Sequence, residues 1–534
     1  MSQALTILAI TCSFFTAYTS AFVQGNCVEG DAGLQWLDSK LSPKAAISCK
    51  GSPLQLYNAG RYWGEQYGRN ASVVVFPVTK EDVSFALQAS SRTPLGCDLA
   101  FVSGAHSQTN ASSSTGFVID LSWMNSTQII HDAKLDDTKV GTAIAYQGGA
   151  TWSQIGAATN GSGYTAVGAR VGNVGAGGFS TGGGIGYLAG AYGYATDRLR
   201  AMEVVLVSGQ IVLATKTNAF SDLFWALQGG GGQFGVVTTF YQEAALEPST
   251  SQFGIWVVND TSLTQAQSNT ADFFATNADP FAVMYYATGF LPAQLQTGDV
   301  GVQTILVGIR FDNPANPSQA SFDATFAPLL ANLSFKSNTS YTVPYGYATE
   351  VIDPFFPYGF RRGFWGPQTE KISAGYLANA TSQLSSYVGS LLANGEVPVS
   401  ALWAIQYMSP GLNGNLPPSD ASTAWPHSVS GHQTLFSPAW NNATDDAVTF
   451  ASNDKFNQLT WDHQATVGKV LADYPNYISP KVSGERVWGD NVDRLIRVKA
   501  KYDPFCRIHQ GRVFATAACK ANRWANVFPG REGH

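Results

Sequence analysis

The sequence predicts a mixed protein of helices and strands that is divided into at least two lobes. The chain has 534 residues, whereas one hydrophobic core ordinarily serves about 100–200 residues. In the first half, β-branched runs alternate with amphipathic runs, and the stretch from 148 to 193 is dense in glycine. After about Glu247 the glycine clusters end, and longer helical patterns alternate with aromatic strands. This change predicts the start of a second domain.

Local signals place the elements of the first half. Residues 72–77 are a β-branched run that stops at a proline, and Thr79 then opens an amphipathic stretch, which predicts a strand followed by a capped helix. Ser208-Gly209 separates two apolar runs and predicts a hairpin. Further strands are expected at 99–102, 116–121, 142–147, 201–207 and 210–213, and helices at 151–159 and 222–227.

The second half gives fewer signals. Helices are expected at 320–331 and 376–394, and a strand at 401–407. Residues 409–440 are rich in loop-forming residues and are expected to line a cleft. Residues 488–503 predict a helix that stops before Pro504, because the residue before a proline disfavours the α conformation.

Composition limits the classes of function. Hydrophobic residues make up 45% of the chain and aromatic residues 12%, enough for a large core. Charged residues make up only 13%, against about 25% in a typical soluble domain, so Ser, Thr, Asn, Gln and Gly must cover most of the surface. The net charge is −6 and no basic cluster occurs, which argues against a nucleic-acid partner.

The N-terminus predicts a secretory signal peptide over residues 1–21. An apolar run spans 4–18 and small residues follow at 19–21, although no Lys or Arg precedes the run. The run is too short for a comfortable membrane span, and no other segment of about 20 apolar residues occurs, so we expect a secreted protein without a membrane partner. N-linked glycans are expected at nine Asn-x-Ser/Thr triplets, which begin at Asn70, Asn110, Asn125, Asn160, Asn259, Asn332, Asn338, Asn379 and Asn442.

Cysteine usage agrees with this compartment. Cys12 leaves with the signal peptide, and the five that remain leave at least one free thiol or an intermolecular bridge. Their spacings do not resemble a zinc site, so no metal is expected. The five are Cys27, Cys49, Cys97, Cys506 and Cys519.

One histidine stands out, although a lone turn histidine is more often structural. His106 ends the run Val102-Ser103-Gly104-Ala105-His106 directly after a predicted strand, and dense glycine clusters follow about 70 residues later at 175–178 and 182–186. A glycine turn that presents one imidazole, followed by backbone able to approach something flat and phosphorylated, is the pattern expected for a flavin tethered through histidine.

Two other enzyme classes receive little support. Residues 184–189 fit the dinucleotide fingerprint G-x-G-x-x-A with Glu203 near the position of a ribose-binding acid, but no hydrophobic strand precedes them. His463 follows an aspartate and His427 follows a proline, yet neither a Gly-x-Ser-x-Gly nor an HExxH motif accompanies them, so hydrolase chemistry is not indicated.

Other short motifs lie before and after the His106 run. They are Phe76-Pro77 with Glu81-Asp82-Val83, residues 118–122, 222–226 and 229–237, and near the C-terminus Asn491-x-x-Arg494-Leu495 with Tyr502-Asp503-Pro504. As a set, these motifs, the His106 run and the glycine clusters resemble the FAD-linked oxidases of the berberine-bridge and vanillyl-alcohol oxidase type, including fungal sugar and secondary-metabolite oxidases. The match covers most of residues 70–245 and 487–512.

The resemblance implies an α+β fold: a two-lobed FAD-binding domain of the vanillyl-alcohol oxidase type, and a substrate domain whose antiparallel sheet is covered by helices. After the signal peptide at 1–21, we expect the FAD-binding domain at 22–247 with its core at about 68–247, the substrate-binding domain at 248–480, and a C-terminal return to the FAD domain at 481–534.

The resemblance also implies the cofactor and its site. FAD is expected to be bonded covalently to His106 only, because Val171 stands where many relatives carry a second, cysteine tether. Val174 aligns with a position where valine leaves space for oxygen beside the flavin. The further residues expected to bind FAD are Ser103, Gly104, Ala105, Ser107, Gly175, Gly177, Gly178, Gly182, Gly183, Gly186, Val237 and Asn491.

The catalytic base is left open by the resemblance. Gln433 and His432 are nearest to the family's position for it, in the strand expected after His427. Tyr407, His427 and His463 are alternatives, because a base needs only to reach the substrate proton. The tyrosine that often precedes the C-terminal asparagine is replaced here by Val487 or Trp488.

The leading hypothesis is a secreted, monomeric oxidase that acts on a small molecule. Hydride from a C–H bond of an alcohol or amine passes to flavin, and O2 takes the electrons and becomes H2O2. A secondary metabolite is favoured as substrate. Open sugar grooves in this family often accompany a flavin held by two tethers, and Val171 in place of cysteine excludes the second tether. The alternatives are an oligosaccharide oxidase, a flavoprotein cyclase or pericyclase with no net redox, and a non-catalytic secreted binding protein.

Overall fold

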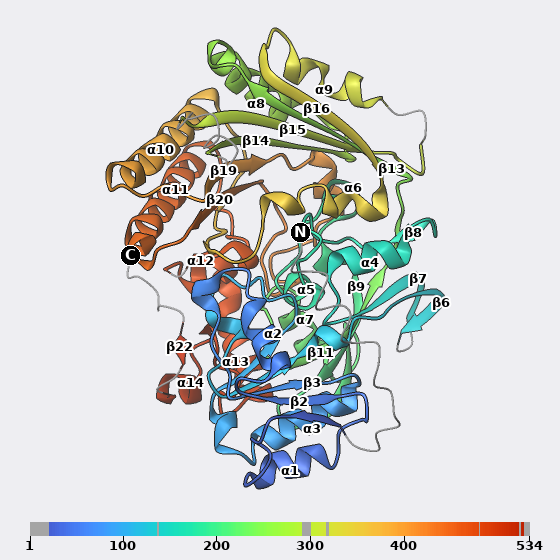
Figure 1. Ribbon diagram of the computed structural model, residues 1–534. Coiled ribbons are helices and arrows are strands. Elements are labelled where there is room, and N and C mark those ends of the chain that lie inside the picture. The colour runs from blue at the N-terminus through green and yellow to red at the C-terminus, as the bar shows by residue number, and fades with distance from the viewer. Residues whose placement is uncertain are drawn as a thin grey trace.

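The computed structural model describes residues 21–135, 138–290, 301–316, 320–479, 481–522 and 525–527. Within these residues the chain forms two lobes that lie one above the other in Figure 1. The lower lobe contains two five-stranded sheets, and the upper lobe contains a larger sheet covered by helices. All but the last residue of the predicted signal peptide lies outside the described residues.

The first sheet has the strand order β1-β2-β3-β5-β4. Its inner strands are buried along their whole length, which explains their unbroken apolar runs. Helix α3 (Lys80–Ser90) begins at Thr79, whose side chain accepts from the Asp82 backbone N–H while the Asp82 carboxylate accepts from the Thr79 N–H. The predicted strand and capped helix are thus confirmed. The other elements are β1 (Phe22–Gln24), β2 (Ala46–Cys49), β3 (Val73–Phe76), β4 (Leu99–Val102), β5 (Phe117–Asp120), α1 (Ala32–Asp38) and α2 (Pro53–Gly60).

The second sheet is antiparallel, with the order β10-β9-β11-β7-β6. The hairpin predicted around Ser208-Gly209 is present as β9 and β10, and the Gly209 φ of 87° provides the turn. The bounds are β6 (Thr127–Leu135), β7 (Thr138–Gln147), β9 (Leu199–Val205), β10 (Ile211–Thr215) and β11 (Val236–Glu243), with a small pair β8 (Tyr164–Thr165) and β12 (Ala245–Leu246) beside them.

Four helices connect the strands of this sheet among the described residues. The predicted helices at 151–159 and 222–227 are confirmed as α4 (Trp152–Thr159) and α7 (Ser221–Leu227). The glycine-rich stretch also holds two short helices that its composition does not predict, α5 (Ala176–Thr181) and α6 (Ala189–Tyr192). They form because their apolar residues pack into buried clusters, so tertiary contacts override the low helix propensity of glycine.

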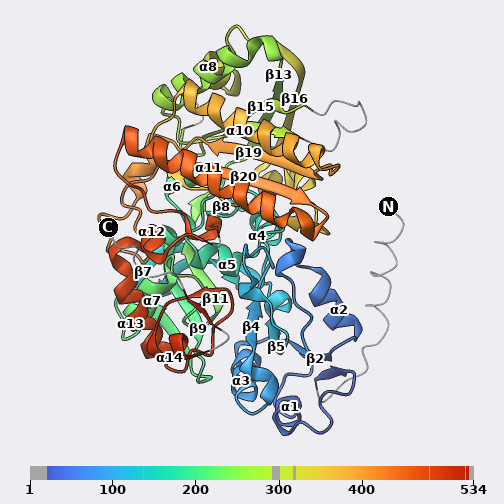
Figure 2. The ribbon, with the colours of Figure 1, turned by 90° about the vertical axis from the view of Figure 1, so that its left-hand side faces the viewer.

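The upper lobe is built on an antiparallel sheet of order β16-β13-β15-β14-β19-β20-β17, with β18 paired to β20. Helices α10 and α11 lie side by side over one face of it (Figure 2). The strands are β13 (Thr250–Val258), β14 (Ala282–Phe290), β15 (Gln303–Phe311), β16 (Phe335–Pro344), β17 (Arg361–Arg362), β18 (Gln368–Thr369), β19 (Ser400–Gln406) and β20 (His432–Trp440). The helices are α8 (Leu263–Thr276), α9 (Phe322–Leu330), α10 (Ala374–Ala393) and α11 (Asp446–Val467).

The composition predicts a loop-rich stretch over 409–440, which is wrong for its last part, whereas the strand expected after His427 from the resemblance is present. Residues 432–440 form β20, which is buried along its whole length. Strand β19 pairs with it in register from Ser400 opposite Ala439 to Gln406 opposite Gln433. The strand forms because β19, β17 and β18 satisfy its backbone groups, and none of these partners is local in sequence.

Alternation along the strands gives this sheet two different faces. Trp256 and Val258 of β13 belong to the core beneath the helices, whereas Ile255 and Val257 point the other way. The second face is lined by aliphatic side chains and turns towards the lower lobe, which positions it as one wall of a cavity.

The C-terminal segment returns to the lower lobe, as Figure 1 shows. Trp488 donates its indole N–H to the Gly229 carbonyl oxygen at 2.9 Å, and Tyr502 donates to the Asp222 carboxylate at 2.7 Å. The predicted helix ends at Tyr502, just before Asp503-Pro504. The elements are α12 (Gly484–Trp488), α13 (Val492–Tyr502), α14 (Ala517–Ala521), β21 (Arg512–Val513) and β22 (Asn526–Val527).

Lys499 fastens this segment to the glycine-rich loops. Its ammonium group is fully buried and donates to the Asp503 carboxylate and the Gln233 carbonyl, both at 2.7 Å, and to the Ile508 carbonyl at 2.8 Å. Replacing Lys499 by methionine is expected to lower the free energy of unfolding by about 3–5 kcal/mol, because the buried Asp503 charge loses its partner.

Thermal and urea unfolding of the two forms measure this difference. Lys501→Met is the matched control on the same helix, because Lys501 is 54% exposed and its pair with Asp222 is worth about 0–1 kcal/mol. Equal losses in the two variants would contradict a structural role for the buried ammonium group.

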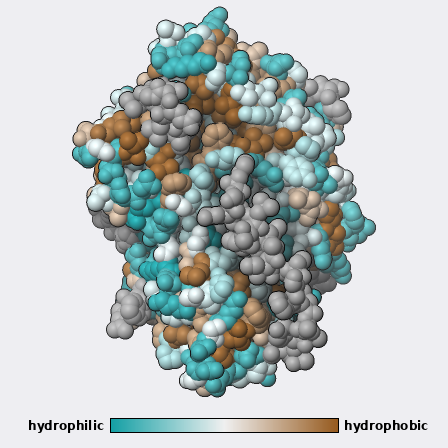
Figure 3. Space-filling model, in the orientation of Figure 1, coloured by the Kyte–Doolittle hydropathy of each residue, from teal (hydrophilic) through white to brown (hydrophobic). Residues whose placement is uncertain are grey.

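The cysteines and the glycosylation triplets are the features that bear on the expected secretion. Disulfides join Cys27 to Cys49 and Cys506 to Cys519, and Cys97 is exposed and has no disulfide partner within the chain, as the odd number of cysteines predicts. All nine asparagines of the glycosylation triplets are exposed or half-buried. Hydrophilic and hydrophobic residues are interspersed on the face in Figure 3. Among the described residues, no helix is long and apolar enough to cross a membrane.

Candidate functional site

A cavity of about 830 Å³ is lined by both lobes. Its lower wall is the His106 loop, the glycine-rich stretch around 174–182 and the loop 230–237, and its upper wall is the aliphatic face of the large sheet. A cavity of this size suits a cofactor or a drug-sized molecule. It is the candidate functional site.

The His106 loop is held close against the glycine-rich stretch. A Cβ atom on Gly104 would lie 2.2 Å from the Gly175 nitrogen, and one on Gly175 would lie 2.1 Å from the Gly104 nitrogen, so both positions require glycine. Ser103 donates to the Gly148 carbonyl at 2.6 Å. Ala105 has a φ of 58°, a conformation that non-glycine residues rarely adopt outside functional turns.

A buried ion pair supports this loop from behind. Arg61 pairs with Asp120, which is fully buried, and donates a second N–H to the Ser103 carbonyl oxygen. Asn58 donates to the other Asp120 oxygen at 2.8 Å. The loop that carries His106 is therefore fixed through its backbone, which leaves the imidazole free to face the cavity.

The imidazole of His106 is neutral at physiological pH. Burial lowers its pKa to about 3, and the charges of Arg362 and Arg61 add to this effect. The ring stacks on Trp63 with centroids 5.2 Å apart, and its Nε2 atom lies 3.1 Å from the Tyr358 hydroxyl. A neutral ring keeps a nitrogen lone pair, which a covalent bond to a cofactor requires.

The glycine loops present bare backbone to the cavity. Gly178, Gly231 and Gly232 line it with no heavy atom within 4 Å of where a Cβ would be, so their main chain faces open space. The Gln108 side chain also lines the cavity, and its buried Oε1 atom has no partner among the described residues. Exposed backbone groups and an orphaned amide fit a large ligand with phosphate and ring polar atoms, as FAD has.

Twelve of the fifteen residues expected to bind the cofactor line the cavity. They are Ser103, Gly104, Ala105, His106, Ser107, Val171, Val174, Gly175, Gly177, Gly178, Gly182 and Val237. The other three lie behind its wall. A Cβ on Gly183 would meet the Trp425 ring, and one on Gly186 would meet the Gly168 carbonyl. Asn491 donates its amide N–H groups to three backbone carbonyls of residues 420–424.

The residues expected to supply the base lie outside the cavity lining. Gln433 has the same strand parity as the lining residues Leu435 and Ser437, but its side-chain amide is already engaged: it donates to the Gly366 carbonyl at 2.8 Å and accepts from the Gln368 amide at 3.2 Å. His432 has the opposite parity, so its ring packs against Phe274 and its Nδ1 accepts from the Met408 N–H at 3.0 Å.

Tyr407 and His463 are engaged elsewhere in the upper lobe. Tyr407 is 1% exposed and its hydroxyl donates to the Asn277 carbonyl oxygen. His463 stacks on Tyr376 with centroids 4.3 Å apart, and its Nε2 atom lies 3.0 Å from the Lys371 carbonyl oxygen. Neither position gives a route to a substrate in the cavity.

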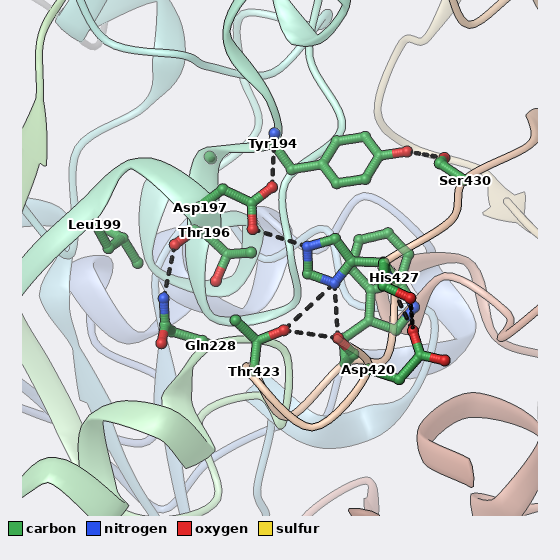
Figure 4. A network of polar contacts seen from close by, with 12 residues as sticks. Tyr194, Thr196, Asp197, Leu199, Gln228, Asp420, Thr423, His427 and Ser430 are labelled. Atoms are coloured by element: carbon green, nitrogen blue, oxygen red, sulfur yellow. Dashed lines mark hydrogen bonds and ion pairs between the residues drawn. The ribbon is translucent and has the colours of Figure 1, made fainter. Parts of the chain in front are cut away.

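His427 belongs to a polar network that joins the lobes (Figure 4). Its Nε2 atom lies 2.8 Å from an Asp197 oxygen, and its Nδ1 atom lies 2.6 Å from the Trp425 carbonyl. The other Asp197 oxygen accepts from the Tyr194 backbone N–H at 3.1 Å. The network anchors the loop before β20 to the lower lobe, and it lies outside the cavity lining.

Sequence reasoning missed an arginine–tyrosine pair in the cavity wall. Arg170 is 8% exposed and donates to the hydroxyl of Tyr477, in the 3₁₀ turn Pro475–Tyr477. The residues are 307 positions apart, so no local pattern could have joined them. Both line the cavity, together with Tyr285, whose buried hydroxyl has no partner among the described residues.

Burial and mutual attraction shift the pKa values of both Arg170 and Tyr477. Burial raises the pKa of Tyr477, and the neighbouring Arg170 charge opposes that rise. Burial also acts to lower the pKa of Arg170, but the surrounding phenols, Tyr477 first among them, hold that pKa above its ordinary value. Arg170 therefore stays cationic and acts to lower the pKa of Tyr477, but burial is the larger effect and the pKa of Tyr477 remains above its ordinary value.

The cavity lining is positive overall. Its charged side chains are three arginines, Arg170, Arg362 and Arg512, and no Asp, Glu or Lys lines it within the described part of the chain. Arg512 donates to the Ser479 and Val482 carbonyls. Arginine is protonated and cannot act as a base, so among the ionisable side chains of the described lining only the phenols and His106 could accept a proton.

Two family models match the chain. Residues 71–215 match the model described as FAD binding domain, and residues 473–505 match the one described as berberine and berberine like. FAD-linked oxidoreductase pgmH of Aspergillus terreus is 33% identical over 208 residues, which are 39% of this chain and 40% of that protein. FAD-dependent monooxygenase sdcF of Emericella nidulans is 24% identical over 478 residues, which are 86% of this chain and 92% of that protein.

A solved structure shares the fold. A variant of berberine bridge enzyme in complex with (S)-reticuline superposes with a TM-score of 0.73 at 17% identity, covering 92% of this chain and 100% of that chain. The predicted α+β architecture with two lobes is confirmed, and so is the resemblance to FAD-linked oxidoreductases of the berberine-bridge type. The chain spans less than half of the length of the Aspergillus terreus relative.

Proposed function

We propose, for a chain that carries an FAD-binding domain and resembles FAD-linked oxidoreductases of the berberine-bridge type, that it is a secreted oxidase of apolar alcohols or amines. The observation that carries the proposal is one cavity in which His106 and bare glycine backbone face an aliphatic sheet wall. Bound FAD supplies the hydride acceptor and returns the electrons to O2. The substrate loses a hydride from carbon and a proton from oxygen or nitrogen, leaving a carbonyl or an imine, while O2 takes two electrons and two protons and becomes H2O2.

His106 is the proposed tether. Its neutral ring, fixed loop and place in the cavity wall support a covalent bond between one ring nitrogen and the flavin. Val171 has no nucleophilic atom, so the proposal includes a bond through histidine only. Val174 also lines the cavity, and its small side chain leaves room for O2 beside the flavin.

The upper wall favours an apolar substrate. Ile255, Val257 and Ile305 line it, and Ala287, Leu402 and Leu435 continue the same surface. A sugar hydroxyl needs a hydrogen-bonding partner when it is desolvated, and these side chains offer none. A secondary metabolite with an apolar or aromatic body fits this wall better than an oligosaccharide.

Tyr477 is the proposed base. It lines the cavity, and Arg170 donates to its hydroxyl, so the phenolate that accepts the substrate proton is paired with a buried cation. Lys and acidic side chains do not line the described cavity, and therefore do not compete for this role. The disulfides and the accessible asparagine triplets support secretion with N-linked glycans.

Anaerobic spectroscopy of the purified protein tests the reaction class. We expect the yellow flavin band to bleach when an aromatic alcohol or amine that is a substrate is added without oxygen, and to return with one equivalent of H2O2 per turnover when air is admitted. Benzylic and allylic alcohols and their amine counterparts form the panel. A product formed with no bleaching would replace the oxidase by a cyclase, and a protein that binds these compounds but never bleaches would be a binding protein.

A further inference from the structure

Arg362 is a buried cation in the cavity wall that has no counter-ion among the residues that the structure describes. It ends β17, is 1% exposed, and lines the cavity. Its Nε and Nη2 atoms are buried without a hydrogen-bond partner among the described residues. The guanidinium carbon lies 5.0 Å from the centre of the Trp63 ring and 5.6 Å from that of Phe360.

The other arginines of this region have acceptors. The neighbouring Arg361 pairs with both oxygens of Asp446, and Arg61 pairs with Asp120. A buried charge without a partner is costly. Burial lowers the pKa of Arg362 to about 10, so its guanidinium remains protonated at pH 7. The cation contacts of two aromatic rings offset part of the cost but satisfy none of its N–H groups.

The backbone of Arg362 is held in place. Its N–H donates to the Gln66 side-chain oxygen at 3.0 Å, and the Gln66 amide donates back to the Arg362 carbonyl. Strand β17 pairs with β20 at Arg362 opposite Ala439. The backbone of Arg362 is therefore fixed at both edges of the strand, and the residue is held among those that line the cavity.

Arg362 stands on the upper lobe, not on the glycine loops. It shares its part of the cavity wall with Phe364, Leu402 and Ser437. These residues belong to the sheet lobe that forms the proposed substrate wall. An anion that satisfies Arg362 is therefore carried by the molecule that lies against this wall.

We propose that Arg362 binds a carboxylate of the substrate, so that the substrate is an aromatic or aliphatic acid whose reacting alcohol or amine lies elsewhere on its frame. This inference rests on the proposed oxidase function, because it names the class of molecule that the oxidase site takes. A guanidinium presents N–H donors in a fork that matches the two oxygens of a carboxylate. The aliphatic side chains of this wall contact the body of the acid, and the guanidinium of Arg362, which lacks an acceptor for two of its nitrogens in the described structure, binds its carboxylate.

Calorimetric titration of the flavin-loaded protein tests the proposal without turnover. Three acids and their amides serve as probes: benzoate and benzamide, cinnamate and cinnamamide, and indole-3-acetate and its amide. Each pair differs in charge but hardly in shape. We expect at least one acid to bind ten times or more tightly than its amide. In Arg362→Met this preference is expected to fall below twofold, and in Arg362→Lys, which keeps the charge, to remain above threefold.

Arg361→Met is the matched control, because it removes the same charge one residue away from a side chain that has its own partner in Asp446. It should keep the tenfold preference. If the wild-type protein binds acids and amides equally, or if the preference survives in Arg362→Met, the proposal is wrong. If Arg362→Met fails to fold, the proposal is still tested by two results: the tenfold preference of the wild-type protein for an acid over its amide, and the preference above threefold in Arg362→Lys. Failure of the oxidase proposal would show separately, as a flavin band that no substrate bleaches.

Discussion

Replacing His106 by alanine is expected to abolish the covalent attachment of flavin completely. The imidazole is the ring that the loop presents to the cavity, and alanine has no nucleophilic atom to take its place. The neighbouring Val171 offers no second attachment point. On a denaturing gel, ultraviolet fluorescence should stay with the wild-type polypeptide and be absent from the variant. The intact mass of the variant should lack the increment of one FAD.

A second histidine provides the control. His131 lies on β6, is exposed, and does not line the cavity, so His131→Ala should keep the full covalent signal. Both variants should fold, because the His106 loop is held through Arg61, Ser103 and the glycine contact and not through the imidazole itself. If the fluorescence stays with the denatured His106→Ala chain, the tether is another residue.

The parts of the fold that could be predicted are those with local causes. The strand at 72–77 and the helix after Thr79 follow from a β-branched run and a capping box, which act within a few residues. The hairpin at Ser208-Gly209 depends on one turn. The stop of α13 depends on Pro504. Each signal is complete within its own segment of sequence.

Strand β20 shows where this reasoning fails. Its sequence follows a long stretch of turn residues and contains Pro438, so local composition favours a loop. Its backbone is satisfied by β19, β17 and β18, and its side chains are buried between the helices and the cavity wall. Partners remote in sequence decide this structure, and no window of residues contains them.

The same distinction divides the site. The glycine positions could be predicted, because close backbone contact demands glycine and the contact between Gly104 and Gly175 leaves that requirement in the sequence. The proposed base could not, because Tyr477 becomes special only through Arg170, which the fold brings to it from the other half of the chain. An arginine in a glycine-rich stretch and a tyrosine in a turn are unremarkable until they meet.

Strand parity explains where the expected bases lie. The resemblance predicts His432 and Gln433 as base candidates because they lie nearest to the family's position for the base, in the strand expected after His427. An odd step along the strand turns His432 to the helix side. The amide of Gln433 is bonded to the Gly366 carbonyl and the Gln368 side chain, and Gln433 does not line the cavity. The resemblance can predict which residues share a strand. The direction of each side chain and its hydrogen-bond partners decide which of them reach the cavity.

Arg170→Met should identify the charge that activates the base. The Arg170 charge acts to lower the pKa of Tyr477, so its removal raises that pKa. The active form is the phenolate, which is populated above its pKa. Burial holds the pKa of Tyr477 above its ordinary value, so the rising limb of the pH profile of kcat is expected in the alkaline range, and it should move to still higher pH in Arg170→Met. A limb that stays in place would separate the arginine from the base.

Replacing Tyr477 by phenylalanine is expected to lower kcat by about 100-fold to 10,000-fold, the usual contribution of a positioned base. The ring, and its contact with Phe364 at 4.6 Å, is retained, so KM should change by no more than a few-fold and covalent flavin should remain. Stopped-flow bleaching under anaerobic conditions isolates this step from oxygen. Tyr376→Phe is the control, since it removes a buried hydroxyl bonded to Thr460 at 2.9 Å outside the cavity, and it should leave the bleaching rate unchanged. If the rate in Tyr477→Phe is unaltered, Tyr285 becomes the candidate base. Tyr285 also lines the cavity, and its hydroxyl has no partner among the described residues.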